Sequence, residues 1–514
     1  MPLALKNAND KSYESMSPIL YSFAAYLALT LIIGLIAWRR TQAMSDYLLG
    51  GRTLGPWTAA LSAGASDMSG WLLLGLPGYA YASGLNALWL AAGLWIGTWL
   101  NWRLMAAPLQ RFSKSFNDSL TLPSYFENRF ADNKQLLRPV SAFFIVAFFL
   151  FYTASGLVAG GKLFSEVFAV DYHLAVLLGT GAIVLYTAIG GFLAVSWTDV
   201  IQGLLMAAAL VMVPVIAFQQ VQPDMNLQAF KAANPQLFLL FHEPNGQPLT
   251  FIAIISLAAW GLGYFGQPHI LARFKAISHH SLVPFARRVA VGWTGVTLLG
   301  GLAVGMIGNA FTATPIADGE KIFIHLVMAL FNPLVAGILL AAILAAIMST
   351  ADSQLLVTTS ALTEDLYKRF TKKPIGEQQL VKLSRWGVLA VAVIACAIAQ
   401  DPDSGVLKLV AYAWAGFGAS FGPALLLSLY WRRMNAYGAL AGIVAGGITV
   451  VIWKQLEGGW FDLYEIVPGI AISFGAIVIV TLLTPRPPQD VQQVVDGLVG
   501  LSKQKPPSLK SDKP

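Results

Sequence analysis

Apolar runs separated by short polar segments recur along the whole chain. Each run has about 20 residues, the length of helix that crosses the hydrocarbon core of a bilayer. We count about thirteen such runs, and the fifth and sixth are separated only by a turn at Gly190 and Gly191. The predicted spans lie near Ile19–Trp38, Thr53–Gly78, Ser83–Ala107, Pro139–Val167, His173–Gly190, Leu193–Phe218, Phe251–Ala272, Ala286–Phe311, Asn332–Asp365, Ser384–Ala399, Val406–Trp431, Ala436–Leu456 and Tyr464–Leu483. The pattern predicts an all-α polytopic membrane protein.

Positive residues support this division and orient it. With an odd number of spans the two ends of the chain lie on opposite sides of the bilayer. If the N-terminus is outside, roughly 26 of the 33 Lys and Arg fall in inside loops and in the C-terminal tail, with Arg273 and Lys275 counted among the loop cations. Lys and Arg collect on the cytoplasmic side of membrane proteins. We therefore expect a multi-pass protein of the inner (plasma) membrane with its N-terminus outside and its C-terminus in the cytoplasm.

Composition excludes several other classes of protein. Hydrophobic residues make up 56% of the chain and charged residues 11%, whereas soluble domains carry about 25% charged residues. The net charge of +7 is explained by the cytoplasmic loops, so nucleic acid is not an expected partner. The lone Cys396 excludes an intramolecular disulfide. No nucleophile–base arrangement or metal-ligand spacing is present, so we do not expect an enzyme.

Two spans contain residues that disrupt a helix. The second carries Asp67 at mid-span, among Gly64, Ser66, Ser69 and Gly70, with no Lys or Arg at helical spacing. A buried carboxylate without a partner is protonated or binds a cation. The alternative is a neutral Asp that bonds neighbouring backbone.

The seventh span carries three glycines and a proline within the run WGLGYFGQPH, which begins at Trp260. Unwound backbone at membrane depth is tolerated only inside protein or beside a watery cavity. The alternative here is a plain proline kink. The two interrupted spans are five spans apart, and such a pair at matching positions indicates an inverted-repeat transporter whose site lies between them.

The ninth span places Ala346, Ser349, Thr350 and Ser353 on one helical face. The hydroxyl oxygens of this face suit a hard cation such as sodium, but Ser and Thr also join membrane helices by hydrogen bonds. Asp199, near the start of the sixth span, is either a group of a second ion site or an N-terminal helix cap.

Four runs carry a family resemblance. They are AGASDMSGW at Ala63–Trp71, GLGYFGQPHILAR at Gly261–Arg273, GGFLAVSWTD at Gly190–Asp199 and AYAWAGFGA at Ala411–Ala419. The chain resembles the sodium/solute symporter family over nearly its whole length, from about Leu48 to Pro468. Its motifs are most similar to those of the proline-transporting members.

The resemblance implies a LeuT-like five-plus-five inverted repeat, one extra helix before it, two after it, and transport by alternating access. It also implies residue roles, carried over motif by motif. The sodium site would use the carbonyls of Ala65 and Met68 together with Ala346, Ser349 and Thr350, with Asp67 adjacent. Asp199, with Ser353, would belong to a possible second ion site. The cargo would meet Ser69, Gly70, Trp71, Tyr152, Trp260, Tyr264 and Pro268. Asp352, beside Ser353, departs from the pattern of the proline carriers and leaves its own role and the sodium number open.

These observations divide the chain into six parts: an extra helix and loop at 1–52, a first repeat at 53–218, an outside connection at 219–250, a second repeat at 251–431, two extra helices at 432–484, and a cytoplasmic tail at 485–514 that we expect to be disordered. The predicted activity is sodium-coupled uptake of L-proline, or of another amino acid, a betaine-like osmolyte, pantothenate or a sugar on the same fold. Sodium, the cargo and the lipid bilayer are the expected partners, and no obligate protein partner is predicted.

Overall fold

The computed structural model is a bundle of helices. It describes residues 2–38, 44–221, 231–232, 234–312, 315–367, 371 and 376–503. The long helices are α1 (Pro2–Trp38), α8 (Leu137–Phe168), α9 (Tyr172–Val221), α13 (Val283–Phe311), α15 (Pro333–Ser360), α17 (Glu377–Ile398), α18 (Val406–Tyr430), α19 (Ala436–Trp453) and α20 (Ile466–Leu483). Within the described ranges the β-structure is limited to two isolated bridges.

Each predicted span falls on helix. By length and composition, eight of the described helices suffice to cross a membrane, and a ninth results if the bent pair at 251–276 is one span. The second and third spans coincide with α3 (Pro56–Asp67) to α4 (Leu76–Ser83) and with α5 (Leu88–Asn101). The fifth span is the first part of α9, and the tenth is α17. The multi-pass membrane architecture is therefore confirmed, whereas the number thirteen stays a prediction.

The joint between the fifth and sixth spans is a single residue. Gly191 has a φ of 66° and interrupts the helical backbone of α9. This left-handed conformation costs little only for glycine, which has no β-carbon. The turn predicted at Gly190 and Gly191 therefore lies where the sequence placed it.

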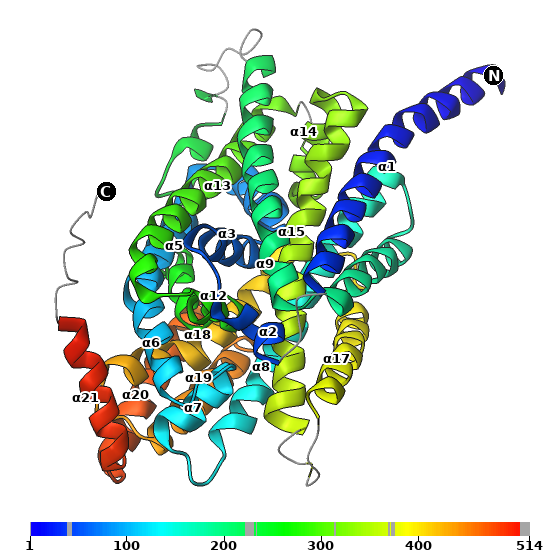
Figure 1. The fold of residues 1–514 in the computed structure, drawn as a ribbon. Helices are drawn as coiled ribbons and strands as arrows, with labels where there is room; N and C mark the ends of the chain where they lie inside the picture. The colour runs from blue at the N-terminus through cyan, green and yellow to red at the C-terminus, as the bar shows by residue number, and fades with distance from the viewer. Residues whose placement is uncertain are drawn as a thin grey trace, which may run out of the picture.

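Short helices close the two ends of the bundle (Figure 1). Helix α14 (Ile322–Leu330) lies at the upper end in this view, and α7 (Leu122–Phe130) lies at the lower end with α21 (Gln489–Lys503). Between them, α15 packs against α1, α3, α8 and α9, while α18 packs against α8, α19 and α20. The helix α15 thus runs through the middle of the bundle, which explains why nearly all its residues are buried.

The tail differs from the expectation. Residues 489–503 form α21 instead of a disordered segment. Val491, Val495 and Leu498 lie on one face of this helix and are buried, and Asp496 forms an ion pair with Arg432. Residues 504–514 lie outside the described part of the chain, as do the predicted loop cations Arg39, Arg40, Lys368, Arg369, Lys372 and Lys373.

Candidate ion and substrate site

The second span is broken at the residues that the sequence singled out. Helix α3 ends at Asp67, and Met68 leaves the helical conformation with φ −87° and ψ 80°. The chain resumes at Trp71 as a π-helical turn, η2 (Trp71–Gly75). The freed carbonyl of Asp67 accepts hydrogen bonds from the Tyr152 hydroxyl at 2.9 Å and from the Trp71 indole at 3.2 Å. Three of the predicted site residues therefore meet at one break.

The seventh span is broken as well. After α11 (Phe251–Ala258) the chain tightens into a 3₁₀-helix, η6 (Ala259–Gly266), and turns at Gln267 into α12 (Pro268–Ala276) with a bend of 47°. Pro268 is the first residue of α12, where its missing N–H is not needed. The glycines allow close packing, because a β-carbon on Gly263 would collide with the Trp414 indole and one on Gly266 with the Phe417 carbonyl. This is more than a plain proline kink.

Four of the five predicted sodium-site residues lie together. The Ser349 hydroxyl is 2.8 Å from the Ala65 carbonyl oxygen and 3.1 Å from that of Ala346. The Thr350 hydroxyl is 3.4 Å from the same Ala65 oxygen. Met68 caps the end of α3, and its thioether accepts a hydrogen bond from the Thr297 hydroxyl. The face of α15 that carries Ser349 and Thr350 therefore joins the helix end of the broken second span.

Asp67 links the two breaks. Its Oδ2 accepts a 2.7 Å hydrogen bond from the Tyr264 hydroxyl of η6, while its Oδ1 is buried without a hydrogen-bond partner among the described residues. The alternative of an Asp bonded to neighbouring backbone is not what the structure shows, since the partner comes from a helix 197 residues away.

Aromatic rings pack against one another beside the breaks. The Trp414 indole donates to the Trp260 carbonyl at 2.7 Å and meets the Tyr264 ring edge to face, with centroids 4.9 Å apart. Tyr152 contacts the same indole, and Trp260 stacks on Tyr464. Trp414 was not predicted as a site residue, although a tryptophan in the small-residue run of the eleventh span was a signal for it.

The remaining predicted cargo residues, Ser69, Gly70 and Pro268, are also buried. Ser69 and Gly70 are buried in the break of the second span, and a β-carbon on Gly70 would lie 2.5 Å from that of Ala159. Pro268 lines a cavity of about 30 Å³ that extends toward Lys275 and Asp365. A second cavity, of about 10 Å³, lies against Asp67. Pockets for small molecules typically have about 300 Å³ or more, so neither cavity holds a cargo molecule without a rearrangement of its walls.

Asp199, which was predicted to belong to a possible second ion site, lies in a buried cluster of charged and polar side chains. Asp199 lies well inside α9 and accepts hydrogen bonds through Oδ2 from Ser62 at 2.6 Å and from Arg273 at 3.1 Å. It is therefore not a helix cap. Ser353 accepts a 2.6 Å hydrogen bond from the same guanidinium. Asp352, next to it, is fully buried.

The position of Arg273 differs from the prediction made from the sequence. It was counted among the inside-loop cations, but its side chain is fully buried. The reason is the 47° bend, which turns α12 into the protein interior and carries residues 268–276 past Ser62 and Asp199. Lys275 is likewise buried, and its ammonium donates to the Leu120 carbonyl at 2.6 Å.

Ion pairs tie helices together at the upper end of the bundle. The Lys162 ammonium of α8 lies 2.7 Å from Glu320 and 2.9 Å from Asp318. The Glu320 carboxylate also accepts the backbone N–H groups of Val406 and Leu407 at the start of α18. One carboxylate thus joins α8, α18 and the connection before α14.

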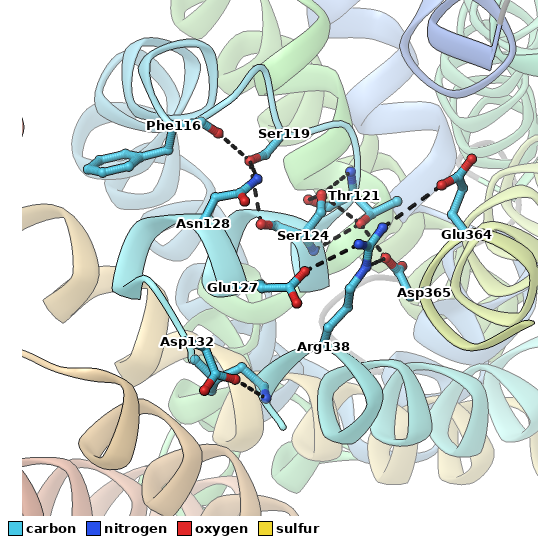
Figure 2. A network of polar contacts seen from close by, with 11 residues as sticks. Phe116, Ser119, Thr121, Ser124, Glu127, Asn128, Asp132, Arg138, Glu364 and Asp365 are labelled. Atoms are coloured by element: carbon cyan, nitrogen blue, oxygen red, sulfur yellow. Dashed lines mark hydrogen bonds and ion pairs between the residues drawn. The ribbon is translucent and has the colours of Figure 1, made fainter. Parts of the chain in front are cut away.

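A second network closes the lower end (Figure 2). Arg138 of α8 points between Glu127 of α7 and two acidic residues that follow α15, with contacts of 3.2 Å to Glu127, 3.9 Å to Glu364 and 2.7 Å to Asp365. Thr121 caps α7 and also donates to Asp365 at 2.9 Å. Helices α7, α8 and α15 are therefore connected at this end.

Helix α7 is also fixed to α18. The Tyr125 hydroxyl and the Ser428 hydroxyl are 2.9 Å apart. Burial raises the pKa of Tyr125 to about 12, so the phenol stays neutral and keeps this hydrogen bond over the physiological pH range. The Arg129 guanidinium donates to the Ser428 carbonyl at 2.9 Å.

The sequence profile described as "Sodium:solute symporter family" matches residues 47–446. Among similar proteins, the chain is 50% identical over 486 residues to a sodium/proline symporter of Salmonella typhimurium, which covers 93% of this chain and 95% of that protein. It is 49% identical to a sodium/proline symporter of Escherichia coli, again over 93% of this chain and 95% of the relative. It is 48% identical to an osmoregulated proline transporter of Bacillus subtilis, over 91% of this chain and 95% of the relative.

Solved structures show the same fold. A Na⁺-coupled sialic acid symporter in a substrate-bound outward-open state matches with a TM-score of 0.74 and 19% identity, over 92% of this chain and 99% of that one. A nucleobase-cation-symport-1 family transporter in a closed conformation matches with a TM-score of 0.52 and 14% identity, over 89% and 98%. At these identities the likeness describes the fold alone.

Proposed function

The chain belongs to the sodium:solute symporter family, and we propose that it is a secondary active transporter that carries L-proline into the cell together with sodium. One observation supports this most directly. Two broken spans meet at Asp67, and the helix end beside it presents the Ala65 carbonyl to the hydroxyls of Ser349 and Thr350. Sodium is the co-transported ion, and the chain is not an enzyme.

Proline suits the chemistry of the breaks. The molecule has a carboxylate, a secondary amine and an apolar ring. Positive helix N-termini and the amides of unwound backbone favour a carboxylate. The faces of Trp71, Tyr152, Trp260, Tyr264 and Trp414 offer contacts for the ring and for the cationic amine.

The topology is part of the proposal. Thirteen spans with the N-terminus outside place α7, α21 and the Arg138 network in the cytoplasm, and α14 with the Lys162–Glu320 pairs outside. Spans two to six and seven to eleven form the two inverted repeats. The matching positions of the two breaks, one in each unit, support this division.

Both ends of the bundle are tied in this structure, which suits alternating access. Outward opening needs Glu320 to release either Lys162 or the start of α18. Inward opening needs Arg138 to release Glu364 and Asp365, which follow α15. Because sodium would bind between α15 and the break after α3, its binding changes the relative energies of these arrangements. The coupling is reciprocal, so proline must tighten sodium binding by the same factor.

The test is labelled-proline flux into vesicles that contain the purified protein. We expect uptake against a proline gradient when sodium is outside, and no accumulation when choline replaces sodium. Unlabelled proline should compete, whereas a betaine, pantothenate or a sugar should not. Proline uptake that is unchanged when choline replaces sodium would refute the coupling. Stronger competition by another solute than by unlabelled proline would identify that solute as the cargo.

A further inference from the structure

A small polar cavity lies beside Asp67 on the side of α5. It has a volume of about 10 Å³, enough for about one water molecule or one dehydrated cation. Its polar lining consists of Asp67, Thr98, Asn101, Tyr264 and Thr294. Its walls come from α3, α5, η4 (Trp102–Ala106), η6, α12 and α13, so it is separate from the α15 face that carries Ser349 and Thr350.

Three of the lining side chains, Asp67, Thr98 and Asn101, have buried polar atoms without a partner among the described residues. Asp67 and Asn101 are 2% and 1% exposed. Within the described chain, Asp67 Oδ1 and both amide atoms of Asn101 are buried and form no hydrogen bond. A buried polar group left unpaired costs about 1–3 kcal/mol, and a charged group costs more. Such a cluster around one cavity indicates a ligand that pairs with it.

The oxygen atoms around the cavity favour a small cation as the ligand. Asp67 forms no ion pair with a described side chain, so its carboxylate lacks a counter-charge. The other oxygen-bearing side chains that line the cavity carry amide or hydroxyl groups, whose oxygens are the ligands preferred by hard cations. Ala63, Gly64, Trp102, Ile270 and Ala290 complete the walls, and the cavity of about 10 Å³ leaves no room for a hydrated ion.

We propose that this cavity is a second cation subsite, in which Asp67 Oδ1, the Asn101 amide oxygen and the hydroxyls of Thr98 and Thr294 bind a dehydrated Na⁺. The subsite rests on the proposed sodium coupling and adds to it. Asp67 follows Ala65 by two residues at the same helix end, so an ion held by the carboxylate changes the position of the Ala65 carbonyl. Asn101 and Thr98 are thereby assigned to sodium binding, although neither belongs to the face of α15.

The experiment is equilibrium binding of ²²Na⁺ to the purified full-length protein without proline. Thr98→Val removes one oxygen at nearly constant volume, and Asn101→Leu removes the amide. We expect both variants to raise the half-saturating sodium concentration by about 10-fold or more. Asn101→Asp keeps the oxygen donors and adds a charge, so it should bind sodium at least as tightly as the unmodified protein.

The matched control is Thr449→Val. Thr449 lies on α19 and its hydroxyl bonds the Ala445 carbonyl of its own helix, so its sodium binding should equal that of the unmodified protein. Melting temperatures identify any variant that does not fold. If Asn101→Leu does not fold, Thr98→Val and Asn101→Asp decide the question.

Three outcomes contradict the subsite. Unchanged sodium binding in Thr98→Val and Asn101→Leu would mean that the cavity holds water only. Equal loss in Asn101→Asp and Asn101→Leu would mean that Asn101 has a structural role. A shift in Thr449→Val as large as that in Thr98→Val would show an unspecific effect. If the unmodified protein binds no sodium, the proposed sodium coupling is wrong. If all variants bind sodium normally, only the proposed subsite is wrong.

Discussion

Removal of the Ser349 hydroxyl is the sharpest test of the predicted sodium site. In the structure this hydroxyl lies 2.8 Å from the Ala65 carbonyl oxygen and 3.1 Å from that of Ala346. The three oxygens thus point to one place between α15 and the end of α3. Ser349→Ala removes one of them and leaves the helix intact, because alanine is the best helix former.

The magnitude follows from the number of oxygens lost. A hydrogen bond to a charged group contributes about 1.5–3 kcal/mol net, and about 1.4 kcal/mol corresponds to a factor of ten. We therefore expect Ser349→Ala to raise the half-saturating sodium concentration by about 10- to 100-fold. Thr350→Ala should have a smaller effect, about 2- to 10-fold, because its hydroxyl is 3.4 Å from the Ala65 oxygen and a longer contact is weaker.

The assay is the initial rate of labelled-proline uptake as a function of external sodium, at fixed membrane potential. The matched control is Thr358→Ala, since the Thr358 hydroxyl is buried on the same helix and bonds the Gln354 carbonyl at 2.7 Å. It lies eight residues beyond Thr350, about 12 Å along the helix. Unmodified sodium dependence in Ser349→Ala, or an equal shift in Thr358→Ala, would refute the assigned site.

Two further predictions concern packing and buried charge. Arg273→Met leaves Asp199 buried without its guanidinium partner, which destabilises the protein by about 3–5 kcal/mol. The melting temperature in detergent should therefore fall. Adding Asp199→Asn to this variant should restore part of the lost melting temperature. Gly263→Ala pushes a methyl group into the Trp414 indole, which destabilises the protein by about 1–3 kcal/mol. Proline uptake and the melting temperature should therefore both fall. Gly475→Ala is the control and should change neither, because a β-carbon at Gly475 meets nothing within 4 Å. A stable Gly263→Ala variant with full uptake would show that the close packing of η6 on α18 is dispensable.

The sequence alone located the helices and the breaks, because both depend on local properties. An apolar run of about 20 residues has few alternatives to a membrane helix. Gly70, Gly263 and Pro268 weaken a helix wherever they occur. For the same reason the turn at Gly191 was predictable to within a residue. The helical face of Ser349 follows from the 3.6-residue period.

Tertiary structure decided which of these residues meet. Arg273 looked like a loop cation because it follows an apolar run, and the bend that buries it against Asp199 is not visible in composition. The partner of Asp67 is Tyr264, 197 residues further along the chain. Asn101 has no distinguishing neighbours in sequence, and it is significant because α5 packs against η6 and lines the same cavity as Asp67. Such pairings depend on the packing of distant helices, whereas helix formation depends on short-range spacing, so the sequence determined the elements and the fold determined the site.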